Sequence, residues 1–154
     1  LDAQGLSLLA GLPRGPLAVG DRWVLCHGAP ADEDQYLTQA RDAGKAFRFL
    51  SAEYPKAEVA FFGHTHVPVI VAEKGRALPP PERFELRPGA RYLINPGSVG
   101  QPRDRVPLAS FGVLDEGEQV YEHYRVPYPI EKTQRKIFDA GLPMALAERL
   151  AGGW

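Results

Sequence analysis

Short apolar runs separated by polar turns occupy the middle of the chain, and they predict a series of strands. The longer runs are Trp23–Cys26, Ala57–Phe62 and Val67–Ala72. Phe84–Leu86 and Tyr92–Ile94 are shorter ones. Leu108–Leu114 and Gln119–Val126 flank an acidic turn that contains Gly117, which is typical of a hairpin. We therefore expect seven strands, the last two paired.

Helical spacing occurs in four places. Apolar residues recur at intervals of three and four from Tyr36 to Tyr54, which predicts an amphipathic helix that Pro55 ends. Asp32, with Gln35 three residues later, is the predicted start of that helix. A short helix is expected within residues 1–20, and two terminal helices are expected at Ile130–Ala140 and Pro143–Leu150.

The order of these elements is strand, helix, strand, several further strands and then helices. This order favours an α/β layered fold, a mixed sheet with helices outside, in a single domain over residues 1–154. In such folds ligands bind at loops that follow the carboxyl ends of strands. His27, His64, His66 and Asn95 all fall on loops of that kind.

Composition narrows the class of protein. Lysine plus arginine total 18 against 19 acidic residues, which argues against a broad nucleic-acid surface and favours a small-molecule or nucleotide ligand. Cys26 is the only cysteine, so we expect no internal disulfide and a reducing, cytoplasmic location. No apolar stretch reaches transmembrane length and no signal peptide is evident, so no membrane partner is expected.

The histidine pair in Gly63-His64-Thr65-His66 follows an apolar strand directly and is the strongest chemical signal. Imidazole is the commonest protein ligand for divalent transition metals. Residues two apart on an extended backbone point to the same face, so His64 and His66 could contact one ion or two adjacent ions. His27, which also follows a strand, is expected at the same rim. The alternative for each is a structural or chance histidine in a polar loop.

The loop from Asn95 to Arg103 is rich in residues that shape the backbone. Gly97 and Gly100 could expose amide N–H groups as an anion nest, and Arg103 could bind phosphate. Asp104 could instead pair with that arginine, and the loop could be no more than a tight turn.

Three other features have structural explanations. His123 lies in the middle of a predicted strand, so we expect a structural role for it. Cys26 lies in an apolar strand and is expected to behave as a small hydrophobe. The acidic residues 32–34 are explained by the start of a helix, where they complement its dipole.

Together, His27-Gly28, Gly63-His64-Thr65-His66 and the Asn95–Asp104 stretch resemble the C-terminal motifs of the calcineurin-like metallophosphoesterases. The likeness is to small bacterial and archaeal members, whose tails resemble residues 128–133. It implies a four-layer αββα sandwich and a binuclear centre of manganese, iron, zinc or a similar ion. It further implies that His27 and His64 ligate one metal and His66 the other. Asn95, Gly97, Ser98 and Arg103 would then border the substrate pocket.

The chain departs from that family in one respect. The Asp-x-His, Gly-Asp and Gly-Asn-His-Asp/Glu motifs of the family's first half are absent, and no initiator methionine is present, since the one Met is Met144. We therefore expect the chain to be the C-terminal portion of a metallophosphoesterase domain that needs an upstream segment of the same protein, with no catalytic residue assigned within it.

The resemblance implies a phosphodiesterase or phosphatase in which a metal-bound hydroxide attacks phosphorus. Two alternatives remain open, a non-catalytic protein-binding scaffold on the same fold and a structural α/β domain with coincidental histidines. The substrate would be a small phosphate ester or nucleotide. A homo-oligomer is possible through Trp154 and the apolar terminal helices.

Overall fold

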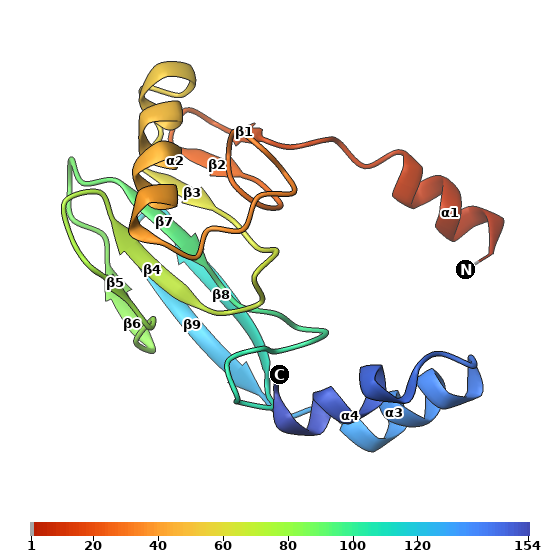
Figure 1. Cartoon of the computed structure of the whole chain (residues 1–154). Helices are drawn as coiled ribbons and strands as arrows, with labels where there is room; N and C mark the ends of the chain where they lie inside the picture. The colour runs from red at the N-terminus through yellow and green to blue at the C-terminus, as the bar shows by residue number, and fades with distance from the viewer. Residues whose placement is uncertain (1) are drawn as a thin grey trace.

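The computed structural model describes residues 2–154, which form helices α1–α4 and strands β1–β9 (Figure 1). The helices are α1 (Ala3–Ala10), α2 (Ala40–Glu53), α3 (Ile130–Asp139) and α4 (Met144–Gly152). The strands are β1 (Leu17–Val19), β2 (Trp23–Leu25), β3 (Val59–Phe61), β4 (Val69–Ala72), β5 (Ala77–Leu78), β6 (Arg83–Glu85), β7 (Tyr92–Asn95), β8 (Ala109–Asp115) and β9 (Val120–Val126).

The larger sheet has the strand order β1-β2-β3-β7-β4-β5. Its centre is parallel, with Trp23 level with Val59 and Val59 level with Tyr92. The flanking pairs β1–β2, β4–β7 and β4–β5 are antiparallel. Because β2, β3 and β7 run the same way, the loops that follow them emerge at one edge of the sheet.

A second sheet, β6-β9-β8, packs its inner face against the larger one. Tyr121 of β9 is fully buried there, with its ring centroid 6.1 Å from that of Phe61. Gly112 on the neighbouring strand β8 has no room for a side chain, because a Cβ would lie 2.3 Å from the Tyr121 ring. The predicted hairpin of the last two strands is confirmed, with Phe111 paired to Tyr124.

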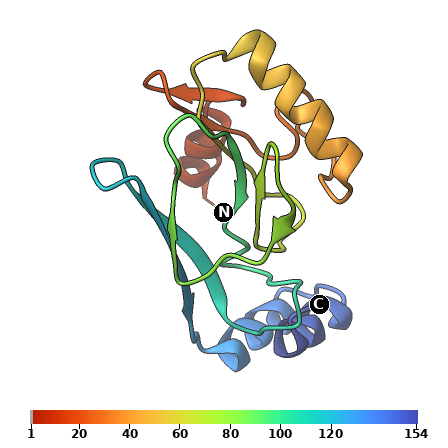
Figure 2. The same cartoon turned by 90° about the vertical axis from the view of Figure 1, so that its left-hand side faces the viewer.

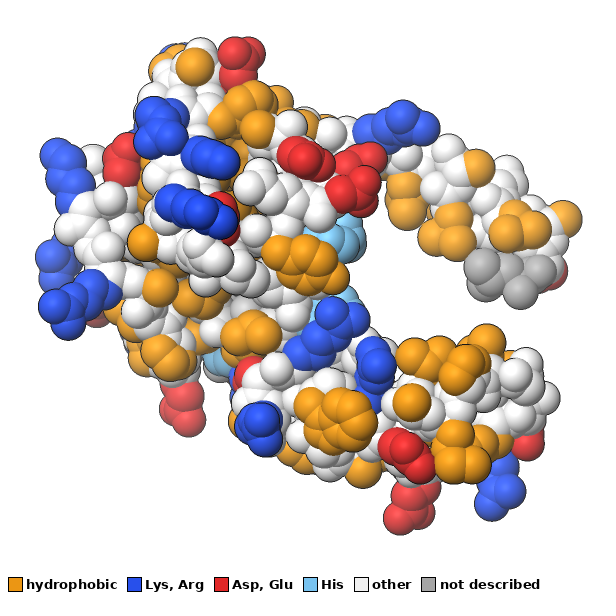
Figure 3. All heavy atoms as spheres, in the orientation of Figure 1, with side chains coloured by type: hydrophobic (Ala, Val, Ile, Leu, Met, Phe, Trp, Pro, Cys, Tyr) orange, Lys and Arg blue, Asp and Glu red, His pale blue; other side chains and the backbone are white. Residues whose placement is uncertain are grey.

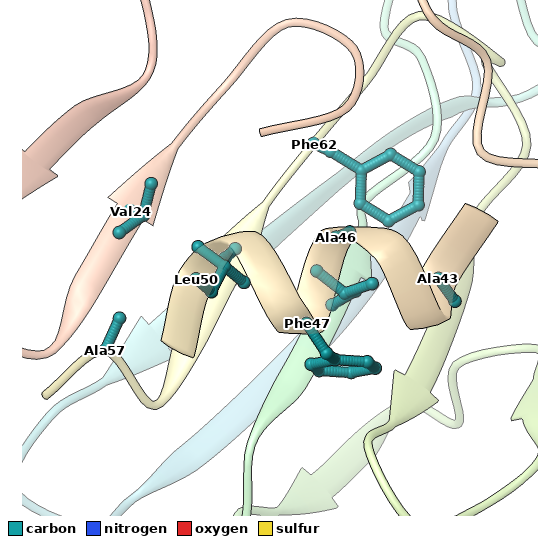
Figure 4. Packing of buried hydrophobic residues seen from close by; sticks show 9 residues of the cluster. Val24, Ala43, Ala46, Phe47, Leu50, Ala57 and Phe62 are labelled. Carbon is teal, nitrogen blue, oxygen red and sulfur yellow. The ribbon is translucent and has the colours of Figure 1, made fainter. Parts of the chain in front are cut away.

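Helix α2 covers the outer face of the larger sheet (Figures 1 and 4). Phe47 and Leu50 point from the helix onto the sheet and are 5% and 2% exposed. They meet Val24, Ala60 and Leu93, which alternate along their strands with residues that face the second sheet. The central strands of the larger sheet are therefore held in place by apolar packing on both faces of that sheet.

Helices α3 and α4 pack on each other and lie beyond the end of the β8–β9 hairpin, and α1 stands apart from both sheets with no buried residue (Figures 1 and 2). The α/β fold class is confirmed. Residues 2–154 supply three of the four expected layers, α2 and the two sheets. No helix among these residues is long and apolar enough to cross a membrane.

The start of α2 differs from the prediction. The helix begins at Ala40, where the carboxylate of Asp42 accepts the backbone N–H of Gln39, and not at Asp32. Asp32 belongs to a tight turn in which its backbone carbonyl accepts the N–H of Gln35. The apolar spacing extends ahead of the helix because Tyr36 packs against the ring of His64 and Leu37 packs against the core beneath α2. Strands β1 and β5 were not predicted, since two or three residues carry too little pattern.

Candidate functional site

The histidine loops meet at the carboxyl edge of the parallel strands. The register places His27, Gly63 and Pro96 at equivalent positions, two residues beyond Leu25, Phe61 and Ile94. The N–H of Gly63 donates to the carbonyl of His27 at 2.8 Å, so the first two loops are bonded directly. The topology thus brings together segments 36 residues apart.

His27 and His64 lie side by side at this edge. The Nε2 atom of His27 is 3.0 Å from the Nδ1 atom of His64, and the ring centroids are 4.7 Å apart. Two imidazole nitrogens that bind one cation at about 2.1 Å each would lie about 3.0 Å apart in octahedral geometry and about 3.4 Å apart in tetrahedral geometry. The observed separation fits a pair of ligands to one divalent ion.

A second contact orients the ring of His64. Its Nε2 atom is 3.2 Å from the backbone carbonyl of Asp34. A carbonyl only accepts hydrogen bonds, so Nε2 carries the proton and the lone pair of a neutral ring lies on Nδ1, toward His27. Tyr36 packs on the other side, with its ring centroid 4.0 Å from that of His64.

A backbone carbonyl also orients the ring of His66, but it contacts Nδ1 instead of Nε2. Its Nδ1 atom donates to the carbonyl of Gln101 at 2.8 Å, which leaves the Nε2 lone pair free. Burial lowers the pKa of His66, and the nearby Arg103 cation lowers it further. A neutral ring is the form that binds a metal.

The backbone of the histidine pair departs from the prediction. His64 and His66 have φ angles of 63° and 58°, in the left-handed region, so the segment is not the extended strand that the i, i+2 argument assumed. The Thr65 N–H donates to the carbonyl of Gly63 at 2.7 Å and tightens the turn. A non-glycine residue in this region costs about 1–2 kcal/mol, which surrounding contacts must offset.

Asn95 supplies those contacts. Its side chain is fully buried, and its amide donates to the Gly63 carbonyl and to Thr65 Oγ1, both at 2.9 Å. Its Oδ1 atom accepts the Gly97 N–H at 2.8 Å. Both polar atoms of the Asn95 side chain are used in these bonds: the amide nitrogen holds the histidine turn, and the oxygen holds the loop of Asn95 itself.

The predicted anion nest at Gly97 and Gly100 is wrong. The Gly97 N–H is taken by Asn95, and the Gly100 N–H donates to the hydroxyl of Ser98. Ser98 also accepts the Gln101 N–H at 2.9 Å, so its hydroxyl caps its own loop. Gly97 has a φ of 88° and lies against Ser110, where a Cβ would be 2.5 Å from the hydroxyl oxygen.

Arg103 does not pair with its neighbour Asp104, which instead forms an ion pair with Arg125. The Nε and Nη2 atoms of Arg103 donate to Gln101 Oε1 at 3.1 and 2.7 Å. Arg149 of α4 approaches the same oxygen at 3.4 Å. Within the described part of the chain, the Arg103 guanidinium therefore has no carboxylate partner.

Two predicted structural residues are confirmed as such. His123 is 9% exposed, with Nε2 2.8 Å from the Ser110 hydroxyl, which donates to the Pro96 carbonyl. Burial lowers the pKa of His123. The thiol of Cys26 donates to the Phe61 carbonyl, and burial raises its pKa to about 12.

Gly28 and the acidic residues after it build the outer wall beside His64. A Cβ at Gly28 would lie 2.3 Å from the Glu33 carbonyl, so the backbone of the two segments approaches too closely for any side chain here. The helix-start explanation of residues 32–34 is wrong, because these residues form a turn ahead of α2. This turn instead places the backbone carbonyl of Asp34 within hydrogen-bond distance of His64 Nε2.

Sequence reasoning missed four contributors, namely Asp34, Tyr36, Gln101 and Arg149. Each acts through a contact with a segment distant in sequence, and no local motif marks it. Within residues 2–154, no group of three or more His, Cys, Asp or Glu side chains is arranged to hold a metal ion. The three imidazoles therefore fit only part of a metal site, a pair for one ion and His66 beside it.

Residues 16–119 match the family model described as the calcineurin-like phosphoesterase superfamily domain. The chain is 43% identical over 93 residues to the uncharacterized protein MJ0912 of Methanocaldococcus jannaschii, covering 60% of this chain and 38% of that protein. A metallophosphoesterase from Sphaerobacter thermophilus superimposes with a TM-score of 0.88 at 36% identity over all of this chain and 63% of its own.

The hypothetical protein PH1004 from Pyrococcus horikoshii shares the fold, with a TM-score of 0.70 at 16% identity over 98% of this chain and 55% of its own. The chain thus spans between about two fifths and two thirds of the length of these relatives. The family model covers most of the residues that form the two sheets and their histidine loops, and on that match the chain belongs to the calcineurin-like phosphoesterase superfamily.

Proposed function

We propose that the protein takes part in metal-dependent hydrolysis of phosphoric esters, as a phosphodiesterase or phosphatase with two divalent ions. The observation that carries the proposal is the 3.0 Å approach of His27 Nε2 and His64 Nδ1 at the carboxyl edge of the parallel strands. Membership of the phosphoesterase superfamily agrees with it.

In this proposal His27 and His64 hold one ion and His66 holds the other. Bound divalent ions lower the pKa of water and stabilise negative charge on phosphoryl oxygens. The chain's own contribution is orientation. The Asp34 and Gln101 carbonyls fix the tautomers of His64 and His66, so that the lone pair lies on Nδ1 of His64, facing His27, and on Nε2 of His66.

Asn95 keeps both histidines in place by bonding the turn between them to its own loop. Arg103 lies next to His66, since its backbone N–H donates to the His66 carbonyl at 3.3 Å. A guanidinium there would attract a phosphate group, which favours a small phosphate ester or nucleotide as substrate.

Hydrolysis of bis-p-nitrophenyl phosphate and p-nitrophenyl phosphate with Mn²⁺ tests the proposal on the complete gene product. We expect metal-dependent turnover, lost by at least about 100-fold in His64→Ala. The 154-residue chain by itself should bind metal weakly, because neutral imidazoles leave the charge of two dications uncompensated. Robust activity of the isolated chain would contradict that part.

A non-catalytic scaffold is the second candidate. In its favour, the side chains of residues 2–154 do not complete a metal site. Metal content of the purified complete gene product, with His66→Ala as the control, separates the two. Close to two bound ions, reduced in the variant, supports the hydrolase, and a metal-free protein supports the scaffold.

A further inference from the structure

Two arginines from distant segments converge on Gln101, and no carboxylate of residues 2–154 pairs with either. Arg103 comes from the loop after β7, and Arg149 comes from α4, outside the segment that matches the family model. Both donate to one neutral acceptor, Gln101 Oε1, at 2.7–3.4 Å. Two like charges around a single amide oxygen repel each other, and nothing within that contact balances them.

Arg125, by contrast, is an arginine whose charge is neutralised. Arg125 forms an ion pair with Asp104, the residue next to Arg103. Among residues 2–154, neither Arg103 nor Arg149 takes part in any ion pair. In addition, the Nε–H of Arg149 is buried and has no hydrogen-bond partner. A buried donor on a cation is costly unless something accepts from it.

The position of these groups indicates what the missing acceptor is. Gln101 holds Arg103 and Arg149 through its side chain and His66 through its backbone carbonyl. Figure 3 shows Lys or Arg side chains next to histidine on the wall of an open hollow bounded by α1 and by the α3–α4 pair. An anion bound by both guanidinium groups would lie close to His66, because Gln101 contacts all three side chains.

We propose that Arg103 and Arg149 form a phosphate subsite that binds a second phosphate group of the substrate, one that is not hydrolysed. Guanidinium groups bind phosphate through paired N–H donors, and the Nη groups of Arg103 and Arg149 supply them here, since the Nε atom of Arg149 is buried. The assignment to substrate rests on the proposed function, whereas the subsite itself does not need bound metal. It makes helix α4 a part of the substrate-binding surface.

Inorganic phosphate, titrated into the protein in EDTA, tests the subsite independently of hydrolysis. The arginine Nε–H signals are followed by NMR, with that of Arg149 identified by its loss in Arg149→Gln. We expect phosphate to shift the Arg149 signal, and the variant to bind phosphate at least about 10-fold more weakly. Arg135→Gln, on the exposed face of the adjacent helix α3, is the matched control and should leave binding unchanged.

Gln101→Glu separates a binding role from a structural one. A carboxylate at this position would neutralise both guanidiniums, so the variant should unfold at the same or a higher temperature and yet lose phosphate binding. An unshifted Arg149 signal in the wild type, or phosphate binding that survives in Gln101→Glu, would overturn the subsite.

With Mn²⁺ and the complete gene product, Arg149→Gln should lower kcat/KM about 10-fold for an ester that carries an additional phosphate. The loss for bis-p-nitrophenyl phosphate, which carries no second phosphate group, should be clearly smaller. Equal effects on both substrates would overturn the assignment to a second phosphate group. Failure of all hydrolysis would refute the proposed function and leave the phosphate titration in EDTA as the test of the subsite.

Discussion

Replacing Asn95 by alanine should destabilise the fold and loosen the histidine turn. The fully buried side chain makes three hydrogen bonds, to Gly63, Thr65 and Gly97, at 2.8–2.9 Å. The Gly63 carbonyl keeps its bond from the Thr65 N–H, so the net value of about 1 kcal/mol per bond applies. The free energy of unfolding should therefore fall by about 3 kcal/mol.

That loss compares with about 2–4 kcal/mol of strain in the left-handed backbone of His64 and His66 together. Without Asn95 the turn can relax toward ordinary backbone angles. Metal affinity should then fall along with stability, although Asn95 itself binds no metal.

Urea unfolding measured by the fluorescence of Trp23, which is 5% exposed, provides the assay in a Trp154→Phe background. Thr65→Val removes one of the three bonds and also the acceptor of the Val67 N–H, so it should cost about 1–2 kcal/mol. In the double variant with Asn95→Ala, a coupling energy of about 1 kcal/mol is expected. A loss below 1 kcal/mol for Asn95→Ala, or additive effects in the double variant, would refute the reasoning.

Three further predictions follow from single residues. Gly28→Ala should destabilise the protein by about 2–4 kcal/mol in the same urea assay, because the new Cβ meets the Glu33 carbonyl at 2.3 Å. Gly44→Ala within α2 should instead stabilise it by about 0.5–1 kcal/mol. Cys26, with its pKa raised to about 12, should react with a thiol reagent at pH 8 at least about 100-fold more slowly than in urea, and equal rates would contradict its burial. Folding lowers the pKa of His123, so the unfolded state binds the proton more tightly. The free energy of unfolding should therefore be constant with respect to this group above the unfolded pKa of about 6.5 and fall as the pH drops below it. His123→Asn should flatten this decline.

The sequence predicted the parts of the fold that depend on apolar periodicity. The central strands and the hairpin were found, because both faces of β2, β3 and β7 are buried and leave continuous apolar runs. The start of α2 was misplaced because Tyr36 has apolar character but packs on His64 instead of the helix core. Short edge strands such as β1 carry only three residues of pattern.

The candidate site was predictable as far as the order of strands determines it. Parallel pairing brings His27 and Gly63 together, and this follows from the element order. The left-handed angles of His64 and His66 could not be inferred, since they depend on a buried amide 29 residues or more away in sequence. The same holds for Arg149, which reaches Gln101 only because α4 folds back onto the loop after β7.

Anomalous scattering from crystals of the protein soaked in Mn²⁺ tests the central claim most directly. The account predicts a metal peak bound at once to Nε2 of His27 and Nδ1 of His64, within about 2.3 Å of each nitrogen. A peak that touches neither nitrogen, or rings that stay bonded to each other at saturating metal, would contradict it.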